Sequence, residues 1–425
     1  MRDQPCPGGT NDPPPAFDLQ DEEGINETSR RIAMANFKYL IIGGGMTADA
    51  AVKGIRQTDA DGSIGILTSE DHLPYNRPPL SKALWKGEPL DSIWRKISAQ
   101  NLTFFRSTRA TGLDTRAKAV KDAKGKTYTY DKLLLATGGK PRQLTGAPHG
   151  VIYFRTLDDY NALREITKPD SQFVVIGGGF IGSEIAAALS MNGKAVTMMF
   201  PESGIGARAY PPSLSKFLTG YFAEKGVRVI HGAMVSSIRK KGKMYTISTG
   251  KKEPIRSDAV IAGLGIVPET DLAATGGLTV ENGIIVDERL QTSAPDVFAA
   301  GDVAAFFSPA LGKRIRVEHE DNALTMGKFA GRSMAGESVN YRHIPFFYSD
   351  LFDLGYEAVG ELDSRLAIVE DWLEPFRKGV VYYLDQGRVK GVLLWNTWGQ
   401  VEAARALLEE SGPIDPKSLP GRIHD

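Results

Sequence analysis

Three consecutive glycines, Gly43–Gly45, follow an apolar run at 37–42 and precede a segment that favours a helix. Such a turn can bind a pyrophosphate, because Gly43 makes the tight turn and Gly45 lets backbone amides approach the phosphates. The small residue Ala48 lets the helix and the strand pack closely. The helix N-terminus then supplies a positive partial charge. This segment therefore predicts a dinucleotide site.

Two acidic residues follow the next apolar strand, SIGILT at 63–68. Glu70 and Asp71 lie at about the 20-residue distance from the turn at which a carboxylate accepts hydrogen bonds from ribose hydroxyls. Together with the glycine turn, they complete the sequence pattern of one dinucleotide-binding unit.

The pattern recurs where the apolar run at 172–176 leads into Gly177, Gly179 and Gly182 and then into a long apolar helix. The next strand, AVTMMF at 195–200, is followed closely by Glu202. A carboxylate at this place favours a free 2′-hydroxyl, and hence NAD over NADP. Arg208, six positions further on, weakens that preference because a cation there suits a 2′-phosphate.

The presence of two copies carries more weight than either copy alone. A single G-x-G-x-x-G is weak evidence, since glycine turns are common, but each copy here follows a strand, opens a helix and is trailed by an acid. Two dinucleotides on one chain indicate a flavin adenine dinucleotide and a nicotinamide dinucleotide, because one transfers a hydride to the other.

Gly301-Asp302, which ends the strand predicted from residue 296, fits the first dinucleotide site. An acid at the carboxyl end of a strand can hold a ribityl hydroxyl, although a turn-forming aspartate is the simpler interpretation. Because this segment follows the second glycine turn, the second unit is inserted into the first. We expect an α/β fold with two Rossmann-like domains, the NAD domain inserted in the FAD domain, and a C-terminal α+β domain. The expected bounds are 36–150 and 265–344 for the FAD domain, 151–264 for the NAD domain and 345–425 for the C-terminal interface domain.

The composition excludes several classes of protein. With 425 residues the chain is long enough for two or three domains. Lys+Arg and Asp+Glu both total 51, so no nucleic-acid partner is indicated. The single cysteine, Cys6, excludes a disulfide framework, a four-cysteine cluster and intramolecular dithiol chemistry. No histidine pair has metal-site spacing, and no apolar run reaches the roughly 18 residues of a transmembrane helix.

The first 35 residues are rich in acids and contain Pro13–Pro15, unlike a secretory signal or an Arg-rich transit peptide. We expect a disordered tail, with Met34 as an alternative start, and a cytoplasmic protein.

The order of five motifs resembles a known family. GGGMTADA at 43–50, PYNRPPLSK at 74–82, ATGG at 136–139, GGGFIGSE at 177–184 and AAGD at 299–302 are similar to the two-dinucleotide flavoprotein reductases. That group includes apoptosis-inducing factor and the ferredoxin reductases of oxygenase systems. FPESG at 200–204, YSDLFDLGYEAVGELDS at 348–364 and KGVLLWN at 390–396 favour the apoptosis-inducing-factor branch, and the resemblance runs from about Phe37 to the C-terminus.

The resemblance implies two sets of cofactor contacts. The residues implied for FAD are Gly43, Gly44, Gly45, Met46, Thr47, Glu70, Asp71, Arg77, Lys82, Ala110, Arg142, Asp302, His319, Glu320 and Tyr348. The residues implied for NAD are Gly178, Gly179, Phe180, Ile181, Glu202, Arg208, Gly265, Glu318, Tyr348, Glu357 and Asn396.

Lys82 and Glu184 match a catalytic pair of the family beside the reactive edge of the flavin ring. A buried ammonium near N5 makes the ring a better hydride acceptor, and the carboxylate keeps that lysine paired. Without the motif, both residues would be read as surface charges.

Three features depart from the apoptosis-inducing-factor pattern. The long insertion of that family is reduced to about 365–377, and no basic nuclear-localisation run is visible. Third, Tyr348 replaces a tryptophan, and Glu320 replaces the second histidine of a pair that begins at His319. His319 on its own reads equally well as a solvated histidine. It precedes a helix expected at 321–334, whose N-terminus can face the N1–C2=O edge of the flavin.

The resemblance predicts an NADH-dependent FAD oxidoreductase whose electrons leave directly from the flavin, because a redox cysteine pair is absent. The sequence does not identify the acceptor, and the candidates are a ferredoxin-like or rubredoxin-like protein and a quinone. One alternative is the ferredoxin reductase of an oxygenase system. Another is an NADH-sensing interaction protein that dimerises through its third domain, where GVVYYL and KGVLLW flank a hairpin turn at 385–387 and a last helix follows at 401–410.

Overall fold

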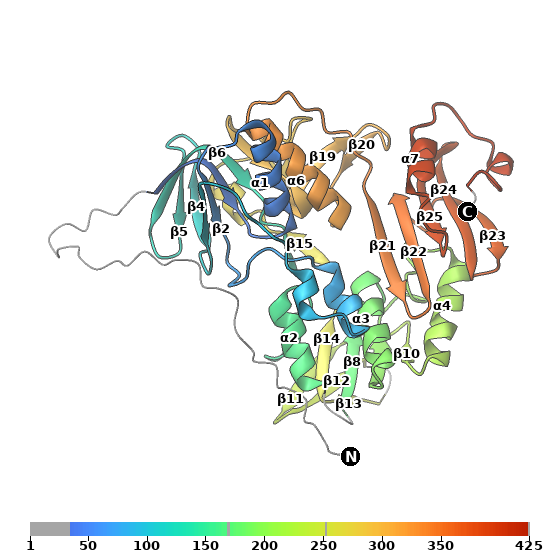
Figure 1. Ribbon diagram of the computed structural model, residues 1–425. Coiled ribbons are helices and arrows are strands. Elements are labelled where there is room, and N and C mark those ends of the chain that lie inside the picture. Colours follow the sequence, from blue (N-terminus) through green and yellow to red (C-terminus); the bar gives the residue numbers. More distant parts are fainter. Residues whose placement is uncertain (1–34, 168–170, 251–252, 424–425) are drawn as a thin grey trace, which may run out of the picture.

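The computed structural model describes residues 35–167, 171–250 and 253–423. Apart from Ala35, the tail predicted over 1–35 lies outside the described residues, and so does Met34. Figure 1 shows three lobes: the first dinucleotide unit, the inserted unit below it and the C-terminal sheet beside both.

The first unit is built on a seven-stranded sheet in the order β3-β2-β1-β6-β5-β4, with β18 also paired to β6. Its strands are β1 (Ala35–Ile42), β2 (Ile64–Leu67), β3 (Leu102–Phe105), β4 (Ala110–Asp114), β5 (Ala119–Asp122), β6 (Thr127–Leu135) and β18 (Val297–Ala299). The strands β3, β2, β1, β6 and β18 run parallel, which places their carboxyl ends along one edge.

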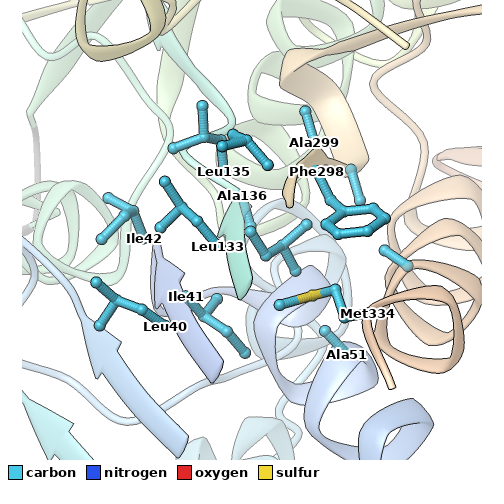
Figure 2. Close-up of a cluster of buried hydrophobic side chains, with 14 of the residues drawn as sticks. Leu40, Ile41, Ile42, Ala51, Leu133, Leu135, Ala136, Phe298, Ala299 and Met334 are labelled. Atoms are coloured by element: carbon cyan, nitrogen blue, oxygen red, sulfur yellow. The ribbon is translucent and has the colours of Figure 1, made fainter. Parts of the chain in front are cut away.

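Helices α1 (Met46–Thr58) and α6 (Glu320–Met334) lie side by side against this sheet (Figure 1). The crossing is tight because a Cβ at Gly331 would lie 2.1 Å from the carbonyl oxygen of Ala51. In Figure 2 Leu40, Ile41 and Leu133 of the parallel strands gather with Phe298 and Met334 in the core of the unit. The helix expected at 321–334 is confirmed and begins one residue earlier.

The inserted unit has a parallel sheet in the order β10-β9-β8-β14. Its elements are α2 (Leu157–Ile166), β8 (Gln172–Ile176), α3 (Phe180–Met191), β9 (Ala195–Met199), α4 (Pro212–Glu224), β10 (Arg228–Ile230), β14 (Ala259–Ala262) and an antiparallel sheet of β11 (Ser237–Lys241), β12 (Met244–Ser248) and β13 (Ile255–Ser257). The two chain crossings that join it to the first unit, β7 (Gly139–Pro141) and β15 (Ile266–Pro268), pair antiparallel with each other. The expected insertion of one unit into the other is therefore confirmed, while the domain bounds stay predictions.

Smaller elements complete the first unit. They are α5 (Asp271–Thr275), a sheet of β16 (Val280–Glu281), β17 (Gly283–Ile285), β19 (Ala304–Ser308) and β20 (Lys313–Ile315), and the 3₁₀ turns η1 (Pro78–Ser81), η2 (Ala83–Trp85), η3 (Leu90–Ile93) and η4 (Gly301–Val303).

The C-terminal domain is an antiparallel sheet in the order β21-β22-β25-β24-β23, covered by one helix. The elements are β21 (Phe346–Leu351), β22 (Leu354–Gly360), β23 (Ala367–Glu374), β24 (Lys378–Asp385), β25 (Arg388–Trp395), α7 (Val401–Glu409) and η5 (Pro416–Ser418). The expected hairpin is confirmed: Gln386 and Gly387, both at positive φ, form its two-residue loop. The final helix is also confirmed, so the α/β class with an α+β third domain stands as expected.

Candidate functional site

A cavity of about 1250 Å³ lies where the three lobes meet, at the carboxyl ends of β1, β2 and β6. It is lined by the first glycine turn, the start of α3, η4, the start of α6 and β21. This is the edge of an open parallel sheet at which ligands bind.

The first glycine turn forms one wall of the cavity. Gly43 has φ +117°, and a Cβ there would lie 2.1 Å from the carbonyl oxygen of Ala136. Gly45 is the N-cap of α1, has no side-chain capping bond and leaves open space where a Cβ would be. The first amides of α1 are therefore free of side-chain caps and available to an anion.

Glu70 lines the cavity just beyond β2. It accepts hydrogen bonds from the Tyr75 hydroxyl at 2.7 Å and from Arg77 Nη2 at 2.5 Å. Burial alone would raise its pKa, but Arg77 and Tyr75 bring the pKa of Glu70 below its usual value, so the carboxylate stays ionised. The neighbouring Asp71 is exposed, lies outside the cavity and faces Arg106.

Asp302, in η4, forms an ion pair of 2.6 Å with Arg155, and Arg77 donates a hydrogen bond to the Arg155 carbonyl oxygen. Arg155 also lines the cavity but was not among the predicted residues. The capping box of Thr156 and Asp159 that directly follows Arg155 predicts the start of α2, but no pattern in the sequence marks Arg155 itself. Through its ion pair with Asp302, Arg155 links the inserted unit to the first one.

Lys82 and Glu184 also line the cavity and lie together, with Nζ and Oε2 2.7 Å apart. The Lys82 side chain is 10% exposed and that of Glu184 only 3%. Lys82 follows η1 in the first unit, whereas Glu184 lies on α3 of the inserted unit. A buried ion pair thus joins the two dinucleotide units beside the cavity.

His319 is the N-cap of α6 and lines the cavity. Its ring stacks on Phe347 with centroids 4.4 Å apart, and its Nδ1 is buried with no partner among the described residues. Burial lowers the pKa of His319 to about 4, so the imidazole is neutral at pH 7. The side chain is thus partly exposed to the cavity while its Nδ1 is buried, which differs from a histidine fully solvated at the surface.

Two more ionisable groups stand beside the lysine. The Tyr348 ring lies 5.4 Å from Lys82 Nζ, and its hydroxyl is 3.4 Å from Glu320 Oε2. Burial raises the pKa of Glu320 and that of Tyr348. Elsewhere on the cavity wall, burial raises the pKa of Glu318, although the Arg316 guanidinium partly lowers it.

The cavity does not reach all of the residues that the family resemblance implied. Those that line it are Gly43, Gly44, Gly45, Met46, Thr47, Glu70, Arg77, Lys82, Ala110, Phe180, Ile181, Glu184, Gly265, Asp302, Glu318, His319, Glu320 and Tyr348. Those outside its wall are Asp71, Arg142, Gly178, Gly179, Glu202, Arg208, Glu357 and Asn396.

The outlying residues have partners of their own. Glu202 pairs with Arg208 at 2.5 Å, and Glu357 accepts a hydrogen bond from the Gly399 amide at 2.9 Å. Asn396, at positive φ, bridges the Gly355 amide and the Arg377 carbonyl oxygen.

Two further features are absent from the described ranges 35–167, 171–250 and 253–423. They contain no group of three or more His, Cys, Asp or Glu able to hold a metal ion. They also contain no helix long and apolar enough to span a bilayer.

Comparison with known proteins adds a family context. A model of the pyridine nucleotide-disulphide oxidoreductases matches residues 37–327, and a model of the C-terminal part of mitochondrion-associated apoptosis-inducing factor matches residues 370–410. Apoptosis-inducing factor 1 of Dictyostelium discoideum is 33% identical over 423 residues, which cover 89% of this chain and 79% of that protein. Putidaredoxin reductase of Pseudomonas putida is 30% identical over 403 residues, which cover 91% and 94%. The crystal structure of a covalent putidaredoxin reductase–putidaredoxin complex matches with a TM-score of 0.84 at 29% identity, covering 91% of this chain and 96% of that one.

Proposed function

Because the chain belongs to the pyridine nucleotide-disulphide oxidoreductases, we propose that it oxidises NADH and delivers the electrons to a ferredoxin-like carrier protein. It is an NAD(P)H-dependent FAD oxidoreductase related to apoptosis-inducing factor and to the ferredoxin reductases, and its expected cofactors, FAD and NAD(H), are confirmed by these relationships. The observation that carries the proposal is the buried Lys82–Glu184 pair at the cavity. The chain has a single cysteine, so a cysteine pair cannot take electrons from the flavin.

The residues present fit FAD. Gly43 makes the tight turn against the Ala136 carbonyl, Gly45 leaves room for a pyrophosphate at the uncapped start of α1, and Glu70 is an ionised acceptor suited to ribose hydroxyls. The orphaned Nδ1 of His319 is a buried polar atom that needs a partner. FAD, when bound, supplies the chemistry of accepting a hydride and releasing electrons one at a time.

The protein groups around the Lys82–Glu184 pair supply charge and order. We propose that the Lys82 ammonium provides positive potential there and that Glu184 keeps it in place. The N-terminus of α6 adds positive partial charge beside a neutral His319. Phe180 and Ile181, both 40% exposed at the start of α3, offer the nicotinamide an apolar wall.

We propose that Glu202 selects NADH by accepting hydrogen bonds from the adenosine ribose. Glu202→Ser is expected to lower the ratio of kcat/KM for NADH to that for NADPH at least tenfold, because Arg208 then loses its carboxylate and is free for a 2′-phosphate. Steady-state kinetics with both donors measure the ratio. Glu224→Ser, an exposed change on α4, serves as the control, and an unaltered ratio in the Glu202 variant would assign selection elsewhere.

The acceptor is tested by anaerobic stopped-flow reduction with NADH, followed by mixing with an oxidised [2Fe–2S] ferredoxin, with a water-soluble quinone or with air. The proposal expects rapid reduction and rapid reoxidation by the ferredoxin. The solved complex of the similar putidaredoxin reductase with putidaredoxin supports this choice of carrier. Faster reoxidation by the quinone than by ferredoxin would overturn it.

A second candidate is NADH-dependent dimerisation with slow turnover, favoured by the match of residues 370–410 to the C-terminal part of apoptosis-inducing factor. Sedimentation with and without NADH under the same anaerobic conditions tests it, and a monomer in both would contradict it. A cytoplasmic location stays a prediction.

A further inference from the structure

The carboxylate of Glu184, on the inserted unit, receives hydrogen bonds from the other two lobes of the fold. Its Oε2 accepts from the Ser81 hydroxyl at 2.6 Å and from Lys82 Nζ at 2.7 Å. Its Oε1 accepts from the Ser349 hydroxyl at 2.6 Å. Ser81 and Lys82 lie in the first unit, Glu184 on α3 of the inserted unit, and Ser349 on β21 of the C-terminal domain. The side chain is therefore fixed from two opposite sides.

Both serines are as deeply buried as the carboxylate. Ser81 is 5% exposed and Ser349 only 1%. Ser349 is also held by its strand, because it stands opposite Tyr356 in the β21–β22 pair, and Tyr356 stacks on Trp395 with ring planes 12° apart. A hydroxyl on such a rigid support can fix the direction of its acceptor.

The three donors satisfy the carboxylate in a definite orientation. A buried carboxylate oxygen without a donor is costly, so it turns towards any donor in reach. Ser349 binds Oε1 on the side away from Lys82, which leaves only Oε2 on the ammonium. The lysine is thus paired through one oxygen and keeps part of its charge directed at the cavity.

From this arrangement we infer that Ser349, with Ser81, is a positioning residue that sets how much of the Lys82 charge reaches the bound FAD. The C-terminal domain then contributes to the reactivity of the flavin through a single hydroxyl, without lying against the reacting atoms. This inference rests on the proposed role of the Lys82–Glu184 pair.

The test is the Ser349→Ala variant of the FAD-loaded protein. Without the hydroxyl, Oε1 turns to the lysine, and both oxygens then neutralise the ammonium. We expect the midpoint potential of the bound FAD to become more negative, because the added electron density is less stabilised. We also expect reduction by saturating NADH to slow about tenfold with little change in KM, since Ser349 does not line the cavity.

Three comparisons separate this role from a loss of structure. Ser349→Thr keeps the hydroxyl and should restore the potential, while Ser215→Ala, which removes a 3%-exposed hydroxyl bound to the Ile205 carbonyl oxygen, should leave the potential unchanged. Ser81→Ala should shift the midpoint potential in the same direction as Ser349→Ala. If Ser349→Ala does not fold, the potential of Ser81→Ala decides whether the hydroxyls act on the flavin.

A double-variant cycle distinguishes this inference from the proposal beneath it. If Ser349 acts through Glu184, then Ser349→Ala adds no further shift in a Glu184→Gln background. A wild-type potential in Glu184→Gln alone would overturn the proposed role of the pair. A shift in Glu184→Gln together with wild-type potentials in both serine variants would overturn the role of the serines only.

Discussion

Replacement of Lys82 by methionine is expected to lower the free energy of unfolding by about 3–5 kcal/mol, because it leaves the buried carboxylate of Glu184 without a counter-charge. The two serine hydroxyls remain, but neutral donors do not compensate a buried charge. Urea denaturation of the holoprotein at fixed FAD concentration measures the loss. The same variant should reduce its flavin more slowly with NADH.

The sequence offers a matched control only four residues away. Lys86 pairs with Asp350 at 3.1 Å, but both side chains are partly exposed, at 44% and 32%. Lys86→Met should therefore cost no more than about 1 kcal/mol. The double variant Lys82→Met/Glu184→Gln should regain most of the lost stability while flavin reduction stays slow. Equal effects of the Lys82 and Lys86 variants would contradict a buried pair.

Replacement of Gly43 by alanine should abolish the retention of FAD through purification. The residue has φ +117°, where an L-amino acid is strained, and the new Cβ would meet the Ala136 carbonyl at 2.1 Å. The carbonyl belongs to the backbone and cannot rotate away as a side chain could, so the turn has to move from the position that presents its amides to the pyrophosphate. A cost of about 2–3 kcal/mol from strain alone lowers affinity roughly 30- to 150-fold.

The retention is read from the ratio of flavin to protein absorbance, and the affinity from FAD titration of the apoprotein. Gly220 on α4 is the control, because it is exposed, lies in a helix and has open space at its Cβ position. Gly220→Ala should leave FAD binding intact and raise stability by about 0.5–1 kcal/mol. A yellow, fully loaded Gly43 variant would show that the turn does not hold the cofactor.

The parts of the site that the sequence predicted are those set by local geometry. The two glycine turns are such parts, since strand, turn and helix follow each other without a break. Glu70 is another predictable part of the site, because it follows closely after Leu67, the last residue of β2. Asp71 follows it directly but points to solvent, and spacing alone could not separate these neighbours.

The contacts between lobes could not be predicted from the sequence. Ser349 lies 165 residues from Glu184, and Asp302 lies 147 residues from Arg155. No pattern of period or spacing connects residues so distant, and only the packing of separate units brings them together. The family motif supplied Lys82 and Glu184 as a pair, whereas the hydroxyls that surround the carboxylate carry no signature of their own.

The insertion also governs the order in which the molecule can form during synthesis. β18 pairs with β6, and α6 packs on α1, yet residues 136–296 separate the two strands along the chain. The first unit therefore cannot close when its own N-terminal half leaves the ribosome. The inserted unit, whose sheet is complete by Ala262, can collapse first and bring the pairing segments together through β7 and β15. A nascent chain that stops before β18 thus leaves Leu133–Leu135 of β6 unpaired on the edge that β18 later covers, and such an edge is prone to pair with other chains.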